Sequence, residues 1–383
     1  MQRTNNTIYS GQNIRVRHDF NKSADTVVIC FANLDPAQRL DSPVFGEPWV
    51  NKSSFSGIYF NCSGNEWYQY AEMQDAVAAA VGVMKGYRTV ISYGTSMGAY
   101  AAIAWSGRLG AHRTLAIAPQ FSITPARAPF EPRWLKEAST IEFIDDDICR
   151  EAGGEIWVAY DPSGLDGRHA AEIAARLRIH PVPLRHCGHM APLTLSQMGL
   201  LAPFLRAVAD GSIDVAAFQT RFRGARALSA SYLSNLSQSG KHLQRKARIL
   251  RKALMLNPDD GPALIQLGDF EMKAGAPLSA LEAYQKALIK RPRDAWLHSR
   301  LGRAFAAAGN PEEALNAAEA ATKFAPQNPW FWFGLGEAAA AFGDRAQATE
   351  AFAMAVRLEP QNAEFRKRMS EFAPERDCEA TND

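Results

Sequence analysis

The segment TVISYGTSMGAYAAIA, residues 89–104, contains the three parts that decide the fold of the first half of the chain. An apolar, β-branched run comes first, a Gly-x-Ser-x-Gly turn follows, and an alanine-rich stretch ends the segment. This order is typical of a buried strand, a sharp turn and a helix. Glycines on both sides of Ser96 permit a strained turn, and the first amides of the helix favour negative charge beside the serine. The segment therefore predicts a nucleophilic serine at the carboxyl end of a strand.

Similar apolar runs alternate with helix-like stretches throughout residues 1–210. Runs that are apolar nearly throughout are expected in strands covered on both faces, as in a mostly parallel sheet. The alternation predicts a doubly wound α/β sheet, in which reactive groups collect at the carboxyl ends of the strands. The predicted strands are residues 13–17, 26–31, 57–61, 89–93, 114–118, 156–160 and 182–184. The predicted helices are residues 66–83, 97–109, 169–177 and 194–209.

A repeat of 34 residues replaces this alternation in the second half of the chain. Its Leu-Gly pairs, single glycines and prolines recur at that interval, and the prolines are Pro258, Pro292, Pro326 and Pro360. The pattern resembles the tetratricopeptide (TPR) family, whose unit is a helix-turn-helix of this length. The resemblance covers residues 241–372, although the family's early tryptophan is present only as Trp332. It implies three full units with one helix before and one after them, in an all-α solenoid that binds a protein or peptide partner.

Two domains are expected from the length of 383 residues and from this change of pattern. We assign the α/β catalytic domain to residues 1–212 and a helical, serine-rich linker to residues 213–240. The TPR domain, of about 3.5 repeats, is assigned to residues 241–375. Residues 330–333 are four successive aromatics that cannot all face inward on one helix, so at least one is expected to contact the catalytic domain or a partner.

The composition indicates an ordinary globular protein, with 47% hydrophobic and 21% charged residues. A formal net charge of +2 gives no electrostatic basis for binding nucleic acid or an anionic membrane. No apolar stretch is long enough for a membrane span, and residues 1–6 lack the apolar core of a signal peptide. The scattered cysteines fit reduced thiols in a cytoplasmic protein: Cys30, Cys62, Cys149, Cys187 and Cys378.

A nucleophilic serine needs a base to take its proton and an acid to orient that base. In the α/β-hydrolase family these residues follow in the order Ser, Asp or Glu, His. The string Gly-His-x-x-Pro at residues 188–192 resembles the family's histidine loop, which implies His189 as the general base. Asp161 directly follows a predicted strand, and Asp166 lies further into the loop. The resemblance favours Asp166 as the acid; the other carboxylate would stabilise the turn or cap a helix.

The same resemblance implies an oxyanion hole built from two backbone amides. The first is that of Met97, directly after the nucleophile, and the second is assigned to Asn33, in the loop after an early strand. The chain departs from the family pattern in having no His-Gly-Gly-Gly string. The segment 121–148 is long for a plain connection and is expected to form a small lid over an apolar cleft. We expect no cofactor and no metal, because the histidines and cysteine of residues 186–189 are too close in sequence to converge on one ion.

Two functions remain open at this stage. The first is a serine hydrolase that cleaves an ester or thioester of a small-molecule or acylated substrate through an acyl-enzyme on Ser96, with the TPR domain contacting a protein partner. Acyl transfer to an alcohol would use the same residues, so the sequence does not separate it from hydrolysis. The second is an inactive hydrolase-like scaffold that acts as a TPR adaptor.

Overall fold

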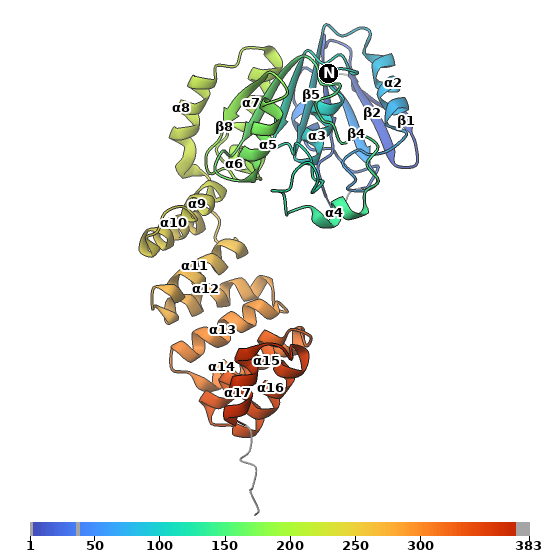
Figure 1. Ribbon diagram of the computed structural model, residues 1–383. Helices are drawn as coiled ribbons and strands as arrows, with labels where there is room; N and C mark the ends of the chain where they lie inside the picture. Colours follow the sequence, from blue (N-terminus) through green and yellow to red (C-terminus); the bar gives the residue numbers. More distant parts are fainter. Residues whose placement is uncertain (1–2, 36–38, 373–383) are drawn as a thin grey trace, which may run out of the picture. The chain divides into compact units, whose positions relative to one another are not determined.

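In a computed structural model that describes residues 3–35 and 39–372, the first half of the chain builds an eight-stranded mixed sheet (Figure 1). The strands are β1 Arg3–Ser10, β2 Ile14–Asn21, β3 Thr26–Phe31, β4 Ser56–Cys62, β5 Thr89–Thr95, β6 Arg113–Ile117, β7 Glu155–Tyr160 and β8 Ile179–Pro183. Their order in the sheet is β1-β2-β4-β3-β5-β6-β7-β8. The pairs β1/β2 and β2/β4 are antiparallel, and every pair from β4 to β8 is parallel. The predicted α/β sheet is therefore confirmed, with an antiparallel edge that makes it mixed.

Helices cover both faces of this sheet. Those up to the end of the first half are α1 Glu47–Asn51, α2 Met73–Met84, α3 Met97–Ala104, α4 Leu135–Thr140, α5 Leu165–Ala174, α6 Ala191–Gln197, α7 Leu201–Asp210, α8 Val215–Ala225 and α9 Ala230–Ser237. Successive residues of a strand point to opposite faces. In β5, Ser92 donates its hydroxyl to the carbonyl of Ala102 in α3, at 2.9 Å. The next residue, Tyr93, lies against Phe45 beside α1, with ring centroids 6.3 Å apart. The helices α3 and α1 therefore pack on opposite faces.

Each predicted strand overlaps one of the strands β2 to β8, and one strand was missed. The missed strand, β1, has the polar sequence RTNNTIYS and lies at the edge of the sheet. It forms by antiparallel pairing with β2, from Arg3 against Asn21 to Ser10 against Arg15. Because an edge strand need not bury a face, hydrophobic periodicity gives little signal for it.

All four predicted helices differ from the structure in their bounds. The helix α3 ends at Ala104 and not at residue 109, and α5 spans Leu165–Ala174 and not residues 169–177. Left-handed backbone explains the other two differences. The helix predicted for residues 66–83 begins only at Met73 in α2, because Trp67 and Tyr68 have positive φ angles of 49° and 58°. The helix predicted for residues 194–209 is divided into α6 and α7, with Gly199 at a φ of 68° between them. Left-handed backbone ends a right-handed helix, and apolar periodicity alone does not reveal it.

The second half of the described chain, up to Phe372, is all-helical (Figure 1). Its helices are α10 Leu243–Leu256, α11 Gly261–Lys273, α12 Pro277–Lys290, α13 Ala295–Ala307, α14 Pro311–Phe324, α15 Pro329–Phe342, α16 Arg345–Leu358 and α17 Ala363–Phe372. Within these described residues, α11 to α16 form three helical pairs, with α10 before and α17 after them. The predicted repeat organisation is therefore confirmed. By its internal contacts the chain divides into two units, Met1–Asn235 and Leu236–Asp383. Residues 373–375, assigned to the repeat domain from the sequence, lie outside the described residues.

Local signals at the repeat interval begin and end these helices. The side chains of Asp260, Asp294 and Asn328, which are spaced by 34 residues, each accept a backbone hydrogen bond at the start of α11, α13 and α15. Such N-caps satisfy amides that have no partner inside the helix. The four recurring prolines each lie two residues beyond the end of a helix, from Pro258 after Leu256 onwards. A proline cannot continue a helix, so it separates one repeat from the next.

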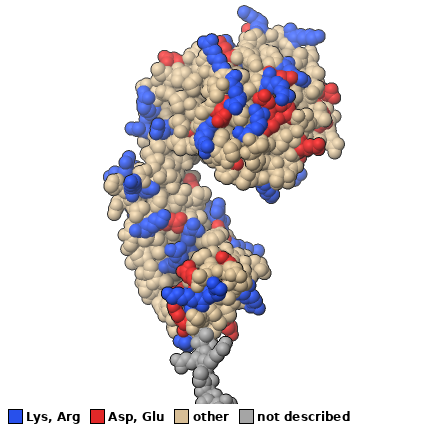
Figure 2. Space-filling view, in the orientation of Figure 1, with Lys and Arg blue, Asp and Glu red and all other residues tan. Residues whose placement is uncertain are grey.

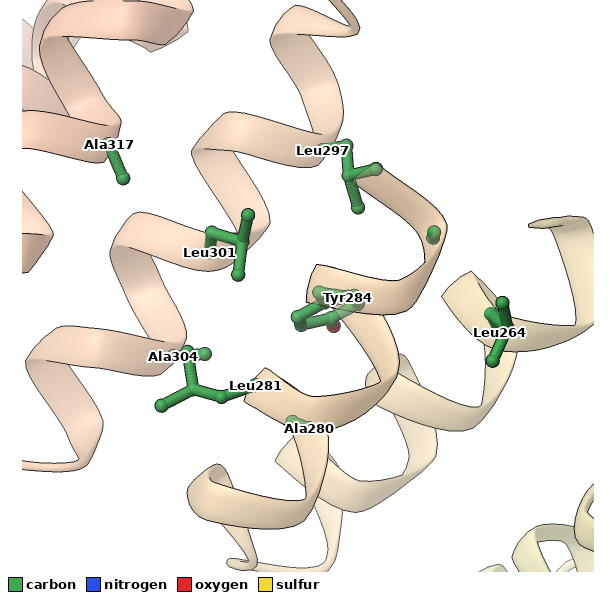
Figure 3. Close-up of a cluster of buried hydrophobic side chains, with 9 residues drawn as sticks. Leu264, Ala280, Leu281, Tyr284, Leu297, Leu301, Ala304 and Ala317 are labelled. Atoms are coloured by element: carbon green, nitrogen blue, oxygen red, sulfur yellow. The ribbon is translucent and has the colours of Figure 1, made fainter. Parts of the chain in front are cut away.

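The repeats are held together by clusters of leucine, alanine and aromatic side chains. Figure 3 shows one of them, in which residues of α11 to α14 surround Tyr284. Its buried members are Leu264, Ala280, Leu281, Tyr284, Ala287, Leu297, Leu301, Ala304 and Ala317. Small residues at repeated positions let neighbouring helices approach closely. At Gly336 of α15, a β-carbon would lie 2.5 Å from the buried ring of Phe352 in α16.

Further sequence expectations concern thiols, charge and membrane spans. Cys30, Cys62, Cys149 and Cys187 form no disulfide, and Cys378 lies outside the described residues. On the face shown in Figure 2, acidic and basic side chains are interspersed over each unit. None of the helices within residues 3–35 and 39–372 combines the length and apolar composition that a membrane span requires.

We predict that two neighbouring glycines of α15 respond oppositely to alanine. Gly336→Ala should lower the free energy of unfolding by about 1–3 kcal/mol, because its methyl group overpacks the contact with Phe352. Gly334→Ala is the matched control, since nothing lies within 4 Å of its β-carbon position. It should raise stability by about 0.5–1 kcal/mol, because glycine is unfavourable inside a helix. Chemical denaturation followed by circular dichroism measures both changes, and equal effects would contradict close helix packing here.

Candidate active site

The polar residues predicted to act together follow the carboxyl ends of parallel strands. These ends meet at one edge of such a sheet, where α/β proteins gather their reactive groups. The residues are Asn33 after β3, Ser96 after β5, Asp161 and Asp166 after β7, and His189 after β8.

Ser96 lies in a strained turn between β5 and α3. Its backbone has φ 51° and ψ −122°, a conformation that an L-residue adopts only when its surroundings impose it. A β-carbon on Gly94 would collide with the carbonyl oxygen of Gly98. A β-carbon on Gly98 would lie 2.6 Å from the carbonyl oxygen of Phe31 at the end of β3. Both glycines of the motif are therefore required by backbone contacts, and the turn leaves the Ser96 side chain partly exposed.

The structure brings Ser96, His189 and Asp166 together. The Oγ atom of Ser96 lies 2.8 Å from Nε2 of His189. The Nδ1 atom of the same ring lies 3.1 Å from each carboxylate oxygen of Asp166. The carboxylate of Asp166 is buried, whereas the side chain of His189 is 21% exposed. The ring of His189 is therefore open to solvent, while the carboxylate of Asp166 is shielded from water.

Asp161 contacts the loop that carries the histidine, and not the histidine ring. Its Oδ2 atom accepts the backbone N–H of Gly188 at 2.8 Å. Its Oδ1 atom accepts the backbone N–H of Ser163 at 2.9 Å and the hydroxyl of the same residue. The carboxylate of Asp161 thus fixes the turn after β7 and the residue before His189.

The helix α9 also contacts the loop that carries His189, and this contact was not predicted from the sequence. Asn235 donates from Nδ2 to the carbonyl of Cys187 at 2.8 Å. A β-carbon on Gly188 would lie 2.8 Å from that same nitrogen, so only glycine fits there. Tyr232 lies edge-on to His186, with ring centroids 5.9 Å apart. These residues belong to the segment interpreted as a linker, where a serine-rich composition gave no sign of such contacts.

Two backbone amides are free at the predicted oxyanion hole. Within the described residues, the N–H groups of Met97 and Asn33 have no acceptor. The neighbouring N–H of Ala32 is already donated to the carbonyl of Phe60 at 3.0 Å, so it is not available. The close approach of Gly98 to the carbonyls of Phe31 and Ala32 holds this loop against the start of α3. The two amides therefore belong to segments in direct contact beside the nucleophile.

A series of hydrogen-bonded polar and charged side chains continues beyond Asp166, and the sequence gave no signal for it. Arg133 donates from Nη1 to Asp166 at 2.9 Å and from Nη2 to Glu131 at 2.5 Å. The Nε2 atom of His169 lies 2.7 Å from Glu131, and its Nδ1 accepts the backbone N–H of Phe121 at 3.1 Å. Because Nδ1 is an acceptor, Nε2 carries the ring proton and donates it to the carboxylate.

This series of side chains controls the ionisation of both carboxyl groups. Burial alone would raise the pKa of Glu131, but hydrogen bonds from His169 and Arg133 outweigh burial and lower that pKa from 4.5 to about 2. Burial also acts to raise the pKa of Asp166, and contacts with His189 and Arg133 lower it below its ordinary value. Both groups are therefore carboxylates at neutral pH. Arg133 belongs to the segment predicted to form a lid, which borders the site through this residue and through Trp134, whose ring centroid lies 6.0 Å from that of His189.

Gln120 is a further residue at the site, and it was not singled out from the sequence. It follows β6, and its Nε2 atom lies 3.2 Å from Oγ of Ser96. Its Oε1 atom accepts the indole N–H of Trp67 at 3.3 Å. Both side chains are fully buried. The one available signal was the position of Gln120 just after a predicted strand, at the edge where the other reactive groups lie.

An apolar cleft of about 480 Å³ begins at the loop that contains Asn33. Asn33 and Asp35 are its polar residues. Its apolar walls come from the segment around α1, from β5 and from α7: Val44, Phe45, Trp49, Tyr93, Leu201 and Leu205. A cleft of this size and composition suits a small apolar group, since ligand pockets are commonly about 300–1,000 Å³ and mostly apolar.

The repeat unit contains a larger groove of about 770 Å³. Its floor is formed by alanines and glycines, and its larger side chains include Trp296, Arg303, Trp330 and Glu337. Trp296 is 56% exposed and Trp330 is 47% exposed, whereas Phe331 is buried. At least one of the four successive aromatics therefore faces solvent, as expected from the helical period.

Comparison with known proteins identifies the repeats. A tetratricopeptide-repeat family model matches residues 271–327 and 305–370. The second half of the chain contains tetratricopeptide repeats. No curated protein matches the chain.

Solved structures similar to parts of the chain include the following three. MamA is 19% identical, over 36% of this chain and 81% of that chain, with a TM-score of 0.35. YrrB, described as a TPR protein with an unusual peptide-binding site, is 19% identical over 46% of this chain and 92% of that chain, with a TM-score of 0.38. The second TPR domain of human RPAP3, solved with an HSP70 peptide, is 21% identical over 28% of this chain and 91% of that chain, with a TM-score of 0.28.

We predict that Glu131→Gln destabilises the protein in a pH-dependent way. At neutral pH the variant should lose about 2 kcal/mol of unfolding free energy, because hydrogen bonds to a charged carboxylate are lost. A carboxyl whose pKa falls from 4.5 unfolded to about 2 folded stabilises the fold above pH 4.5 and loses that contribution toward pH 2. The difference between the two proteins should therefore shrink over that range in chemical denaturation. Glu142→Gln, an exposed change in the same segment, is the control; a Glu131→Gln deficit independent of pH would contradict the assignment.

Proposed function

We propose that the first unit is a serine hydrolase of the α/β-hydrolase type that cleaves an ester or thioester. The observation that carries the proposal is the continuous contact from Ser96 through His189 to Asp166, with distances of 2.8 and 3.1 Å. Ser96 in a strained turn and two free amides beside it support the same chemistry. The apolar cleft that begins at Asn33 supports an acyl group as the part of the substrate bound next to the reacting carbonyl.

The reaction proceeds in two halves. Ser96 Oγ attacks the carbonyl carbon while its proton passes to Nε2 of His189, and Asp166 stabilises the imidazolium that forms. The N–H groups of Met97 and Asn33 donate to the oxygen that becomes negative. His189 then protonates the leaving oxygen or sulfur, which departs and leaves the acyl group on Ser96. In the second half a water gives its proton to His189 and attacks the acyl-enzyme, and Ser96 recovers its proton as the acid is released.

Arg133 adds a positive charge next to the carboxylate of Asp166. Its guanidinium keeps Asp166 ionised, but it also places a positive charge near the imidazolium that must form on His189. Glu131 compensates, since it binds the same guanidinium and is itself ionised. The ion pair with Glu131 thus offsets the positive charge of Arg133 beside the site.

We predict that a fluorophosphonate probe labels the protein and that Ser96→Ala abolishes the labelling. Ser96 Oγ attacks the phosphorus of the probe and forms a phosphonate ester, while fluoride leaves and the hydroxyl proton passes to His189; the variant has no such hydroxyl. Gel fluorescence and intact-mass measurement report the modification.

The two aspartates supply the control for this prediction. Asp166→Asn should reduce the labelling rate by about 10⁴-fold, because the histidine is then held in the wrong tautomer. Asp161→Asn should reduce it less than about tenfold, because an amide oxygen can still accept the N–H of Gly188. Absence of labelling in folded wild-type protein would instead favour the inactive scaffold.

For the repeat unit we propose binding of a protein partner through the groove that contains Trp296 and Trp330. Tetratricopeptide repeats support such a role, and solved repeat domains include ones bound to peptides. Exposed aromatics beside a groove floor of small residues provide large contact area at little conformational cost.

We predict that Trp330→Ala weakens partner association at least about tenfold, because exposed tryptophans commonly dominate such interfaces. Leu278→Ala is the control, because Leu278 is 71% exposed but does not line the groove. Affinity purification followed by quantitative mass spectrometry compares the partners that each variant retains. Equal losses with both variants, or no loss with either, would exclude this groove as the binding surface.

A further inference from the structure

We propose that Gln120 is a further catalytic residue and Trp67 a positioning residue, which together direct the hydroxyl proton of Ser96 toward His189. This inference rests on the proposed hydrolase function. It extends the three-residue site to a chain of five side chains, in the order Trp67, Gln120, Ser96, His189 and Asp166.

The two ends of this series of hydrogen bonds, together with the role of His189 as the base, set the direction of each bond. The indole N–H of Trp67 can only donate, so the Gln120 atom 3.3 Å away must be the amide oxygen. The amide nitrogen of Gln120 then faces Ser96 Oγ, at 3.2 Å, and donates to it. At the other end the ionised carboxylate of Asp166 can only accept, so Nδ1 of His189 carries the ring proton. In its role as the general base, His189 accepts at Nε2, and the remaining proton, that of Ser96, points to it.

Gln120 restricts the rotation of the Ser96 hydroxyl group. A serine hydroxyl has a single proton and can rotate it toward any nearby acceptor. Gln120 presents a donor to the Ser96 oxygen, so the proton cannot rotate toward that side. Both Gln120 and Trp67 have no exposed surface, so water does not compete for either group. The hydroxyl is consequently held in the orientation from which His189 removes its proton, before any substrate binds.

The backbone holds both residues in place at a cost. Trp67 has a φ of 49°, and Ala118, two residues before Gln120, has a φ of 51°. Left-handed backbone at residues other than glycine costs on the order of 1–3 kcal/mol and is found where surrounding contacts impose it. Next to Gln120, the N–H of Phe121 is anchored to His169 at 3.1 Å. The ring of Trp67 also packs against Trp134, at 5.5 Å between centroids. Backbone conformation and hydrogen bonds therefore both hold Gln120 and Trp67 in place.

The first test measures how fast Ser96 reacts. Gln120→Ala should lower the maximal rate of fluorophosphonate inactivation about three- to tenfold, the range expected for loss of one hydrogen bond. The probe concentration at half-maximal rate should change by less than twofold, because Gln120 contacts Ser96 and its loss should affect the reaction step and not the binding of the probe. Gln74→Ala makes the same chemical change on the exposed face of α2 and should leave both quantities unchanged. Thermal unfolding of each variant identifies any that do not fold.

The second test asks whether Trp67 acts through Gln120. Trp67→Phe keeps an aromatic ring but removes the indole donor. It should slow inactivation, because the amide of Gln120 is then free to rotate. In the double variant the two losses should not add, and its rate should match that of Gln120→Ala alone. If the rate losses of the two single variants multiply in the double variant, Trp67 contributes packing and does not orient Gln120.

The third test reverses the donor at position 120. In Gln120→Glu the ionised carboxylate accepts from Trp67 and draws the Ser96 proton away from His189, so inactivation should be slower than in Gln120→Ala. When protonated, the new carboxyl group can donate to Oγ as the amide does. Its burial raises its pKa, so the rate relative to wild type should recover as the pH falls. The variant and the wild type share the same neighbouring titratable and charged groups, so comparing their rates at each pH removes the effect of these groups. They are Glu131, Arg133, Asp166, His169 and His189.

The outcomes separate the inference from the function on which it rests. Suppose that the wild type is labelled and that Ser96→Ala abolishes the labelling. Unchanged rates in Gln120→Ala and no pH-dependent recovery in Gln120→Glu would then overturn the inference, but the proposed hydrolase function would stand. No labelling of the wild type would overturn both. The inference is supported if Gln120→Ala is inactivated more slowly, the double variant shows no additional loss, and the rate of Gln120→Glu recovers at lower pH.

Discussion

The left-handed backbone of Ser96 is the constraint on which the rest of the first unit depends. With φ at 51°, the chain reverses sharply between β5 and α3, and the side chain stands at the carboxyl edge of the sheet. The turn forms because Gly94 and Gly98 allow backbone atoms to touch where a methyl group would collide. The second of these contacts reaches the end of β3, so the same residue that permits the turn also places the Asn33 loop. Strain at Ser96 and the placement of the Asn33 loop beside it therefore have one cause.

Around this turn, hydrogen bonds join segments that are far apart in sequence. Ser96 and His189 are 93 residues apart, and Trp67 and Gln120 are 53 apart. The histidine loop is held from two directions, by Asp161 after β7 and by Asn235 in α9. Parallel strands make this possible because their carboxyl ends meet at one edge regardless of the length of chain between them.

The charges at the site are arranged so that each has a partner. Asp166 accepts from His189 and Arg133, and Arg133 is shared with Glu131, which in turn accepts from His169. A buried carboxylate without such partners would take up a proton, because burial disfavours the charged form. The repeat unit depends on a simpler rule, in which recurring small residues let helices approach and recurring caps set their ends.

The sequence alone determined what local patterns encode. The motif around Ser96 predicted the strand, turn and helix, and the 34-residue interval predicted the repeats, because both arise from interactions within a few turns of chain. It also indicated His189 and two candidate aspartates by their order, and the family resemblance favoured Asp166 over Asp161. Tertiary structure decided that Asp166 contacts His189 and that Arg133, Gln120, Trp67 and Asn235 join the site. These contacts depend on how distant segments pack, and such packing leaves no periodic trace in the sequence. The left-handed residues Trp67 and Tyr68 show the same limit, since tertiary contacts there overrode an apparently helical pattern.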